Sequence, residues 1–436
     1  MRAWPSGGLW RHADFLRLWG GQTISQFGSQ VSQLAIPLAA ILVLHTSAFE
    51  VALLSTVEFL PFLLFTLPMG VWADRLVRRP ILVWSDAGRA AALATVPIAY
   101  AFGALTIWQL LAVGFVIGSL TVSFDVAYQS YLPSLVGRQA LVSGNSLLEV
   151  SRTSAQVAGP GVGGILVGVL TAPYAILVDA VSFACSAVLV VRIRSREEPP
   201  QPAERRSMWQ ELREGLGYLL RHRYWRPMAA TTGATNFFWS LVGAVLLVYA
   251  VRTLRMSPAI IGLVITLGSL GGLVGAVFAR RVSVRFGVGP TILGAAILFG
   301  PPLVLVPLAS RTWAIPLLVV AFVLSTAGAS VYVITGLSLM QTLTPERLLG
   351  RMNASRRFIV FGTIPLGSLV GGVLASQLGL RPTIWVGAIG ACFCFLPIAF
   401  SPIRGIRTMP TEPEPETEPE TGFASIAVPA GASADA

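Results

Sequence analysis

The chain has 436 residues, of which 54% are hydrophobic and 12% are charged, and its mean hydropathy is +0.72. Soluble globular domains carry about 25% charged residues, so this composition excludes an ordinary soluble protein and indicates an integral membrane protein. The net charge is +11. A nucleic-acid interface would need that charge on one face of a soluble domain, which the sequence does not contain, so we expect no nucleic-acid partner.

Twelve apolar runs of about 20 residues are long enough to cross a bilayer as helices. They lie near residues 21–44, 50–73, 80–102, 106–131, 141–170, 173–193, 227–251, 259–279, 288–310, 313–340, 348–376 and 381–402. All 31 basic residues are arginines, and most of them fall in cytoplasmic segments if both termini are cytoplasmic. The sequence therefore predicts an all-α, multi-pass protein of the cell inner or plasma membrane, with twelve transmembrane helices.

A polar connector and an internal repeat divide the chain into two six-helix bundles related by a pseudo-two-fold axis. The repeat has an offset of 208 residues and pairs Asn145, Gly159, Gly163 and Gly164 with Asn353, Gly367, Gly371 and Gly372. The expected divisions are a cytoplasmic segment at 1–19, bundles at 20–194 and 226–405, a cytoplasmic connector at 195–225, and a disordered, acidic and proline-rich cytoplasmic tail at 406–436.

Amide side chains form a stripe along the first apolar run. The run is too long for the core of a signal peptide, so we expect this helix to be retained. Substrate binding and hydrogen bonding between packed helices are equally compatible with these amides. The candidates for substrate contact are Gln22, Gln26 and Gln30.

A tight charged turn follows the second apolar run. Such a concentration of charge cannot sit in hydrocarbon, so the turn marks a cytoplasmic loop. The residues of this motif are Gly70, Asp74, Arg75, Arg78 and Arg79.

Ionisable side chains within apolar helices cost about 2.5–3.5 kcal/mol each to insert, so they are candidates for function. Asp86, which has Arg89 three residues later, and Asp179 are expected to be structural. No histidine falls in a predicted span, so any proton must be carried by a carboxylate. The proton-coupling candidates, all expected to be buried in the first bundle, are Glu149, Asp125 and Glu58, in that order.

The fifth predicted helix combines a polar face with a glycine-rich end. Asn145, Glu149, Arg152 and Gln156 recur at helical spacing, so we expect them to line a cavity or another helix, with a static Glu149–Arg152 ion pair as the alternative. The small residues beyond them allow close helix approach, and the proline introduces a bend where the interface between the halves must deform. The alternative is that these residues only pack two helices tightly together. This second motif is Gly159, Pro160, Gly163 and Gly164.

The seventh predicted helix offers Asn236, Phe237 and Trp239 as a cavity wall, although lipid-facing aromatic side chains are common. The three cysteines do not form a pattern typical of a disulfide or a metal site. We expect no metal and no cofactor.

These motifs resemble the efflux branch of the major facilitator superfamily, particularly the macrolide exporters and the enterobactin exporter. The resemblance covers the chain apart from the connector and the tail. It rests on Phe15–Gln22, Gly70–Pro80, Asp125–Gly164 and Gly350–Phe358.

The resemblance implies that Asp74 contacts the start of the eleventh helix, where Arg351, Arg356 and Arg357 lie, and so locks an outward-facing form. It also implies that the Gly159–Gly164 motif belongs to an antiporter. The sequence departs from the pattern on the fourth helix, where the usual arginine is missing from residues 121–131.

The expected function is proton-coupled antiport that exports a small amphiphilic molecule, such as a drug, an antibiotic or a siderophore, by alternating access. The expected partners are this substrate, protons and the lipid bilayer, with the protein acting as a monomer. An importer or a uniporter is the main alternative, and a non-transport membrane protein such as an enzyme is a remote one. A chain without lysine cannot contain a Walker-type loop, which excludes an ATP-driven pump.

Overall fold

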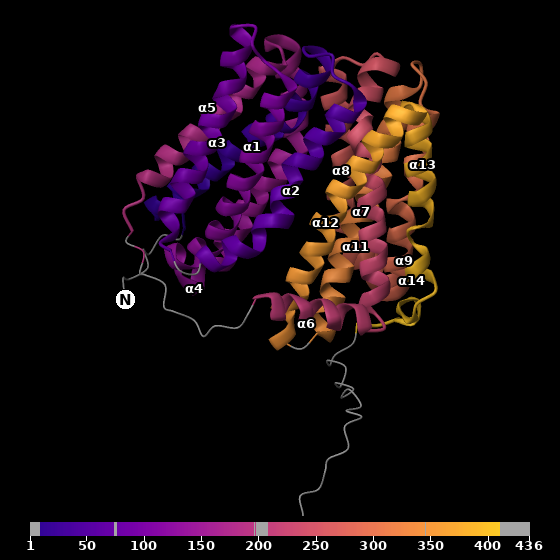
Figure 1. The fold of residues 1–436 in the computed structure, drawn as a ribbon. Helices are drawn as coiled ribbons and strands as arrows, with labels where there is room; N and C mark the ends of the chain where they lie inside the picture. The colour runs from indigo at the N-terminus through magenta and orange to yellow at the C-terminus, as the bar shows by residue number, and fades with distance from the viewer. Residues whose placement is uncertain (1–8, 74–75, 196, 198–207, 345, 410–436) are drawn as a thin grey trace, which may run out of the picture.

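The computed structural model describes residues 9–73, 76–195, 197, 208–344 and 346–409, and these residues form helices and their connections (Figure 1). The first half contains α1 (Ala13–Leu42), α2 (Ala48–Ala73), α3 (Arg78–Ala101), α4 (Ile107–Leu170) and α5 (Ala172–Val191). The connector contributes α6 (Met208–Arg221). The second half contains α7 (Trp225–Val248), α8 (Pro258–Phe286), α9 (Val288–Phe299), α10 (Leu305–Leu308), α11 (Ala314–Leu343), α12 (Glu346–Leu378), α13 (Leu380–Phe393) and α14 (Leu396–Ala399).

Helix α4 contains two membrane spans. Its 64 residues are interrupted at Gly137, whose φ of 71° and ψ of 165° are not helical. Glycine adopts positive φ without the steric penalty of a side chain, so the chain reverses there. The spans on either side are Ile107–Gly137 and Ala140–Leu170.

Proline breaks another predicted span without ending it. Helix α9 stops before a short 3-10 turn, Pro301–Val304, and α10 continues from it. Proline lacks the backbone N–H that a helix needs and therefore interrupts the ladder of hydrogen bonds. The three pieces form one span, Val288–Leu308.

Eleven helices of the described chain are long and apolar enough to cross a membrane, and α1 is the twelfth membrane helix. It has 30 residues and lies against α4 and α5, which both carry membrane spans. Its glutamine and serine side chains keep its most apolar stretch below the hydropathy of the eleven other spans. The predicted fold of twelve membrane helices is confirmed, although α1 begins at Ala13, inside the segment 1–19 that was expected to precede the membrane.

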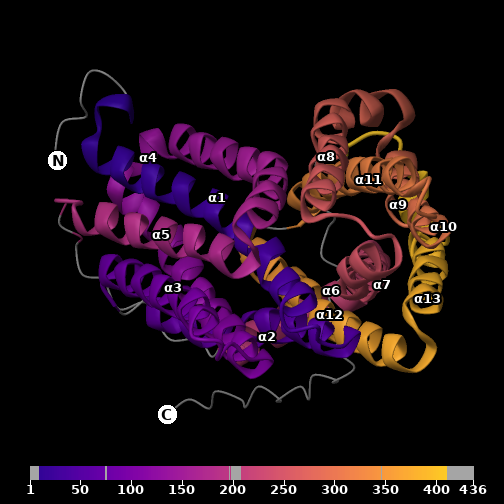
Figure 2. The same ribbon diagram turned by 90° about the horizontal axis from the view of Figure 1, so that it is seen from above.

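The two halves meet along two seams, α4 with α8 and α2 with α12 (Figures 1 and 2). A Cβ built on Gly164 of α4 would lie 3.0 Å from the Cα of Gly262 in α8. A Cβ built on Gly372 of α12 would lie 3.4 Å from the Cα of Phe49 in α2. Glycine is therefore what lets each pair of backbones approach so closely.

The same repeat orders the contacts within each half. A Cβ on Gly163 would lie 3.2 Å from the Cα of Val31 in α1, and a Cβ on Gly371 would lie 3.1 Å from the Cα of Leu241 in α7. Glycines that are 208 residues apart thus make equivalent contacts, one pair within the halves and one pair between them. The internal repeat of the sequence is therefore a repeat of helix packing.

The apolar core shows where the halves join and where they part. One buried cluster runs through both halves, from Val31 in α1 to Ile261 in α8. Two further clusters each belong to one half, around Phe15 and Tyr131 in the first and around Trp225 in the second. We call the end with the shared cluster the far end. The other end carries the arginine-rich loops and is called the basic end; the halves spread apart there (Figure 1).

Candidate functional site

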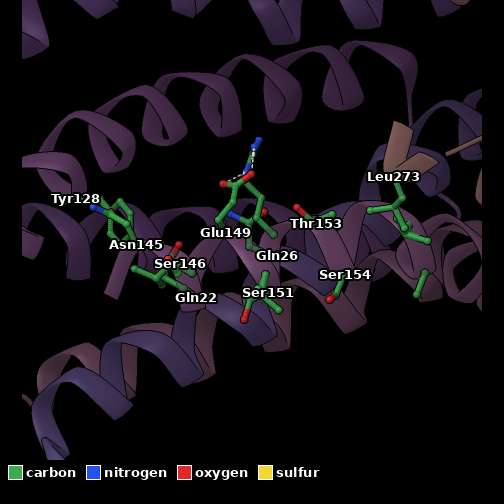
Figure 3. A pocket seen from close by; sticks show the side chains of 15 residues that line it. Gln22, Gln26, Tyr128, Asn145, Ser146, Glu149, Ser151, Thr153, Ser154 and Leu273 are labelled. Atoms are coloured by element: carbon green, nitrogen blue, oxygen red, sulfur yellow. Dashed lines mark hydrogen bonds and ion pairs between the residues drawn. The ribbon is translucent and has the colours of Figure 1, made fainter. Parts of the chain in front are cut away.

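A cavity of about 1060 Å³ lies along α1 and α4 of the first half and reaches α8 of the second half (Figure 3). Its wall comes mostly from the second span of α4 and from α1, with a single residue from α8. Toward the far end the helices converge, because a Cβ on Gly161 would lie 2.9 Å from the Thr266 hydroxyl oxygen. The lining residues are Gln22, Gln26, Tyr128, Asn145, Ser146, Leu148, Glu149, Val150, Ser151, Arg152, Thr153, Ser154, Val157, Ala158 and Leu273.

The predicted amide stripe of α1 divides between the cavity and the packing. Gln22 and Gln26 line the cavity. Gln22 is only 7% exposed, and its amide nitrogen has no hydrogen-bond partner within the described chain. Gln30 instead packs against Gly159, where a Cβ would lie 2.7 Å from its Cγ. The stripe is therefore divided between two residues that line the cavity and one that packs α1 against α4.

Glu149 and Arg152 form a two-pronged ion pair on the cavity wall (Figure 3). The Arg152 Nε donates to Glu149 Oε2 at 2.9 Å and its Nη2 donates to Oε1 at 2.6 Å. The side chains of Glu149 and Arg152 are 58% and 50% exposed. The expectation that Glu149 is buried is therefore wrong, because the open cavity brings solvent to it. Of the predicted polar face, Asn145 also lines the cavity, whereas Gln156 is exposed and does not.

Asp125 and Glu58 lie on other helices and do not join Glu149 in one cluster. Asp125, on the first span of α4, lies within electrostatic reach of Arg89, Arg152 and Arg357. The Glu58 carboxylate, on α2, makes no hydrogen bond or ion pair with another described residue. Both side chains are partly exposed, and neither is among the residues that line the cavity.

A second pair, Asp86 with Arg89, lies buried inside the first half. Asp86 is fully buried and Arg89 is 5% exposed, and they form an ion pair. The Arg89 guanidinium lies 4.6 Å from the ring centre of Phe124 and 4.1 Å from that of Phe183, and its Nη1 is 3.4 Å from the Thr121 hydroxyl. Arg89 of α3 thus reaches the helix on which the expected family arginine is missing. The i,i+3 spacing was the only signal of this pair in the sequence.

The Asp179 carboxylate is also buried, at 2% exposure, and accepts a hydrogen bond from the Ser182 hydroxyl at 3.0 Å. It faces Gly28 of α1, where a Cβ would lie 2.5 Å from its Oδ1. These contacts are those of a residue that packs α5 against α1.

The charged turn is described only in part. Asp74 and Arg75 lie outside the described residues, and Gly70 falls within α2. Arg78 and Arg79 begin α3, and their partners are at the end of the first half. Arg78 Nη1 lies 3.1 Å from Glu197 Oε1, and Arg79 donates to the carbonyls of Val190 and Val191. Nothing in the local sequence around Glu197 indicated this contact.

The candidates on α7 pack within the second half. Asn236 Nδ2 donates to the Thr232 carbonyl on its own helix at 2.8 Å. Phe237 contributes its carbonyl to the close contact with Gly367. The Trp239 ring lies 5.8 Å from that of Phe299 and 6.2 Å from that of Phe322. None of the three lines the cavity, so the expected aromatic wall is not found there.

The aromatic contact between the halves is instead a stack of Phe62 in α2 on Phe361 in α12, with ring centres 4.9 Å apart. The Arg357 guanidinium lies 5.9 Å from the Phe361 ring centre. Within the described residues, no group of three or more His, Cys, Asp or Glu side chains is arranged to hold a metal ion.

Two bundles of six membrane helices with a cavity that reaches both are the architecture of a transporter of the major facilitator superfamily. The family model described as "Transmembrane secretion effector" matches residues 8–421, and the chain belongs to this family. It is a multi-pass membrane transporter that acts on small molecules, and it is not an enzyme.

Two relatives are efflux proteins. The multidrug efflux pump Tap of Mycolicibacterium fortuitum is 28% identical over 353 residues, which cover 77% of this chain and 83% of the relative. Macrolide efflux protein A of Streptococcus pyogenes is 26% identical over 211 residues, which cover 48% of this chain and 52% of the relative. The resemblance to the efflux branch is confirmed.

Solved structures share the fold at low sequence identity. A bacterial homologue of the iron transporter ferroportin in its inward-facing state superposes with a TM-score of 0.70 at 18% identity, covering 90% of this chain and 98% of the homologue. The outward-facing state of a bacterial ferroportin homologue gives a TM-score of 0.55, also at 18% identity, with coverage of 88% and 98%.

Proposed function

We propose that the protein is a proton-coupled antiporter that exports a small amphiphilic molecule by alternating access, as a monomer in the plasma membrane. The observation that carries this proposal is the cavity along α1, α4 and α8, in a molecule whose halves spread apart at the basic end (Figure 1) and are held together toward the far end by the glycine seams. The printed names of Tap and macrolide efflux protein A support export as the direction of transport.

The proposed orientation places the basic end and both termini in the cytoplasm. Arginine is enriched in cytoplasmic loops of membrane proteins, and the arginines of this chain gather at that end. The better superposition on an inward-facing structure than on an outward-facing one supports a cytoplasm-open state. Substrate would then enter from the cytoplasm or the inner leaflet.

The cavity wall supports an amphiphilic substrate. The first half supplies amides and hydroxyls, including the side chains of Gln26 and Asn145, and the second half supplies Leu273. The Glu149 charge is balanced by Arg152 on the same wall. A ligand with a hydrogen-bonding face and an apolar face would satisfy both sides.

Proton coupling remains assigned to Glu149, Asp125 and Glu58. The geometry supports different roles for them, because Arg152 balances the charge of Glu149 whereas no described residue pairs with Glu58. A carboxylate without a paired arginine can exchange its proton without first breaking an ion pair.

Transport into inside-out vesicles tests the proposal. With a radiolabelled macrolide as the probe, vesicles that are acidic inside should accumulate it, and collapsing the pH gradient should abolish the accumulation. A uniporter would equilibrate the probe regardless of the gradient, and an importer coupled to protons would not accumulate it. Vesicles from cells that lack the protein are the control.

A further inference from the structure

A second, smaller cavity of about 70 Å³ lies within the second half and shares no lining residue with the larger cavity. The connector helix α6 contributes one residue to its wall, and α7, α11 and α12 contribute the others. A cavity needs about 10–15 Å³ to hold one water molecule, so this one has room for a small charged group and a few carbon atoms. Its apolar lining residues include Leu219, Met228, Leu337, Met340, Met352 and Ile359.

Arg356 is the charged side chain of this wall, and it forms no ion pair within the described residues. Its Nε is buried and has no hydrogen-bond partner there. The groups within electrostatic reach of it are Arg357 and the Tyr332 hydroxyl, and neither is an acid. A partly buried cation without an anion is costly, so the wall lacks a negative group that a ligand could supply.

The rest of the second half offers no counter-ion. Glu346 is the only acid in the sequence from α7 to α14, and it precedes Arg356 by ten residues on α12. At 1.5 Å per residue this separation is about 15 Å along the helix, which is too long for an ion pair. The absence of acids that confines the proton-coupling candidates to the first half therefore also leaves Arg356 unpaired.

Trp225 supplies a second unpaired donor to the same wall. It is 2% exposed, and its indole N–H has no hydrogen-bond partner within the described chain. Trp225 is also the first residue of α7, where the helix dipole favours a negative charge. The hydroxyls of Thr232 and Tyr332 are already engaged, because they lie 3.1 Å apart and the Tyr332 hydroxyl donates to the Met228 carbonyl at 3.2 Å.

The two unpaired donors lie at the boundary of the membrane, and part of the apolar wall lies deeper. Trp225 begins the span Trp225–Thr253, and Arg356 is the second residue of the span Ser355–Leu378. Because both side chains line one cavity, the two spans begin at the same end of the molecule. Met228 and Ile359 follow three residues later, close to one helical turn further into the spans. A fatty acid in a bilayer has the same order, since its charged head stays at the surface and its chain lies in hydrocarbon.

We propose that this cavity binds the carboxylate head of a fatty acid from the membrane. The two oxygens of a carboxylate match the Arg356 guanidinium and the Trp225 indole N–H, and hydrogen bonds between charged groups are strong. A phosphate monoester carries up to about two negative charges, which exceeds the single positive charge of the wall. Because Leu219 belongs to the connector, a bound fatty acid would also fix α6 to the second half.

Photolabelling of the purified protein in lipid nanodiscs tests the proposal. The probe is a fatty acid that carries a diazirine group close to its carboxylate. In the parent protein, mass spectrometry should find its adducts on the peptides that contain Met228 and Met352. An excess of hexanoate should suppress these adducts, whereas 1-hexanol, which has the same chain length and no charge, should not.

Arg356→Gln should lower the labelling about tenfold or more, as expected for lost hydrogen bonds to a charged group. Trp225→Phe, which keeps an aromatic ring and removes the N–H, should lower it less. Arg357→Gln is the matched control, because Arg357 is the adjacent arginine but is exposed and does not line this cavity. Without fatty acid, Arg356→Gln should keep the thermal unfolding midpoint of the parent, since it removes a charge that has no partner.

Equal labelling of Arg356→Gln and the parent would overturn the proposal, and so would equal suppression by hexanoate and 1-hexanol. Stronger suppression by hexyl phosphate than by hexanoate would also overturn it, because the ligand would then be a phosphate. Adducts that are confined to other parts of the chain would show that the cavity is not the site. None of these measurements involves transport, so a failure of macrolide export would refute the proposed function without affecting them.

Discussion

Two ion pairs with the same sequence spacing have opposite environments. Asp86 and Arg89 are buried, whereas Glu149 and Arg152 are half exposed to the cavity. An exposed pair contributes about 0–1 kcal/mol, because water screens it, whereas breaking a buried pair costs about 3–5 kcal/mol, because it strands a charge away from water. The spacing predicted both pairs, but only the packing of α3 against α4 and α5 decides which one is structural.

We therefore predict that Asp86→Asn lowers the thermal unfolding midpoint of the purified protein strongly and that Glu149→Gln leaves it nearly unchanged. The buried Arg89 would lose its partner, whereas Arg152 could turn to solvent. The double variant Asp86→Leu with Arg89→Met, which removes both charges, should recover part of the loss. Equal midpoints for the two single variants would contradict this account.

Asp14, which lies outside the membrane ahead of the spanning part of α1, is another carboxylate whose partners determine its contribution to stability. Burial alone would raise the pKa of Asp14, but the hydrogen bonds from Ser195 and Arg194, with Arg17, together hold it below its usual value of 3.8. A carboxylate whose pKa is lowered by folding adds stability above its unfolded pKa, and this stability is lost as the pH falls through the folded pKa.

The stability difference between the parent and Asp14→Asn should accordingly be about 1.5–3 kcal/mol at neutral pH, as for hydrogen bonds to a charged group. It should shrink as the pH falls below about 4, the usual range of an aspartate. Thermal unfolding in detergent at several pH values measures it. A difference that does not change with pH would show that the Asp14 charge plays no part.

At the scale of helices, the glycines of α4 differ in the neighbouring helix that each one contacts. Gly164 touches the backbone of α8, whereas a Cβ on Gly168, one turn later, would meet no atom within 4 Å. The sequence predicted close approach at the Gly159–Gly164 motif but left open which neighbour each glycine faces. The structure divides them, since Gly159 and Gly163 face α1 within the half and Gly164 faces the other half.

Gly164→Ala should therefore destabilise the sealed far end, because the backbone of α8 cannot move aside cheaply. The state open at the basic end should lose population. Labelling of a Ser146→Cys variant by a membrane-impermeant maleimide in inside-out vesicles should therefore slow, because Ser146 lines the cavity. Gly168→Ala in the same background should label at the parent rate. Equal slowing by both substitutions would point to a general effect on helix α4.

At the scale of the whole molecule, the sequence was sufficient for the twelve helices and the repeat, because apolar length and recurring glycines are local signals. It was not sufficient for Trp239, because a helix that is apolar all round does not show which side faces a neighbour. It also missed Glu197, whose partners are more than 100 residues away. The side of the membrane to which the cavity opens depends on the packing between the halves, and no single segment encodes it.

The halves also differ in charge, which leads to a last prediction. Every carboxylate in a predicted span belongs to the first half, and the only acid between Arg226 and Arg404 is Glu346. If protons drive transport, substrate binding between the halves should expel a proton from the first half alone. Substrate-induced proton release by the purified protein should be lost in at least one of Glu149→Gln, Asp125→Asn and Glu58→Gln.

We expect the largest loss in Glu58→Gln, because no described arginine pairs with that carboxylate, whereas the Glu149 carboxylate is already held by Arg152. Proton release is followed with a pH-sensitive dye in weakly buffered detergent solution after addition of a macrolide. Asp179→Asn, which changes a carboxylate buried between α5 and α1, is the control and should release protons as the parent does. Unchanged release in all three test variants would place the coupling outside these carboxylates.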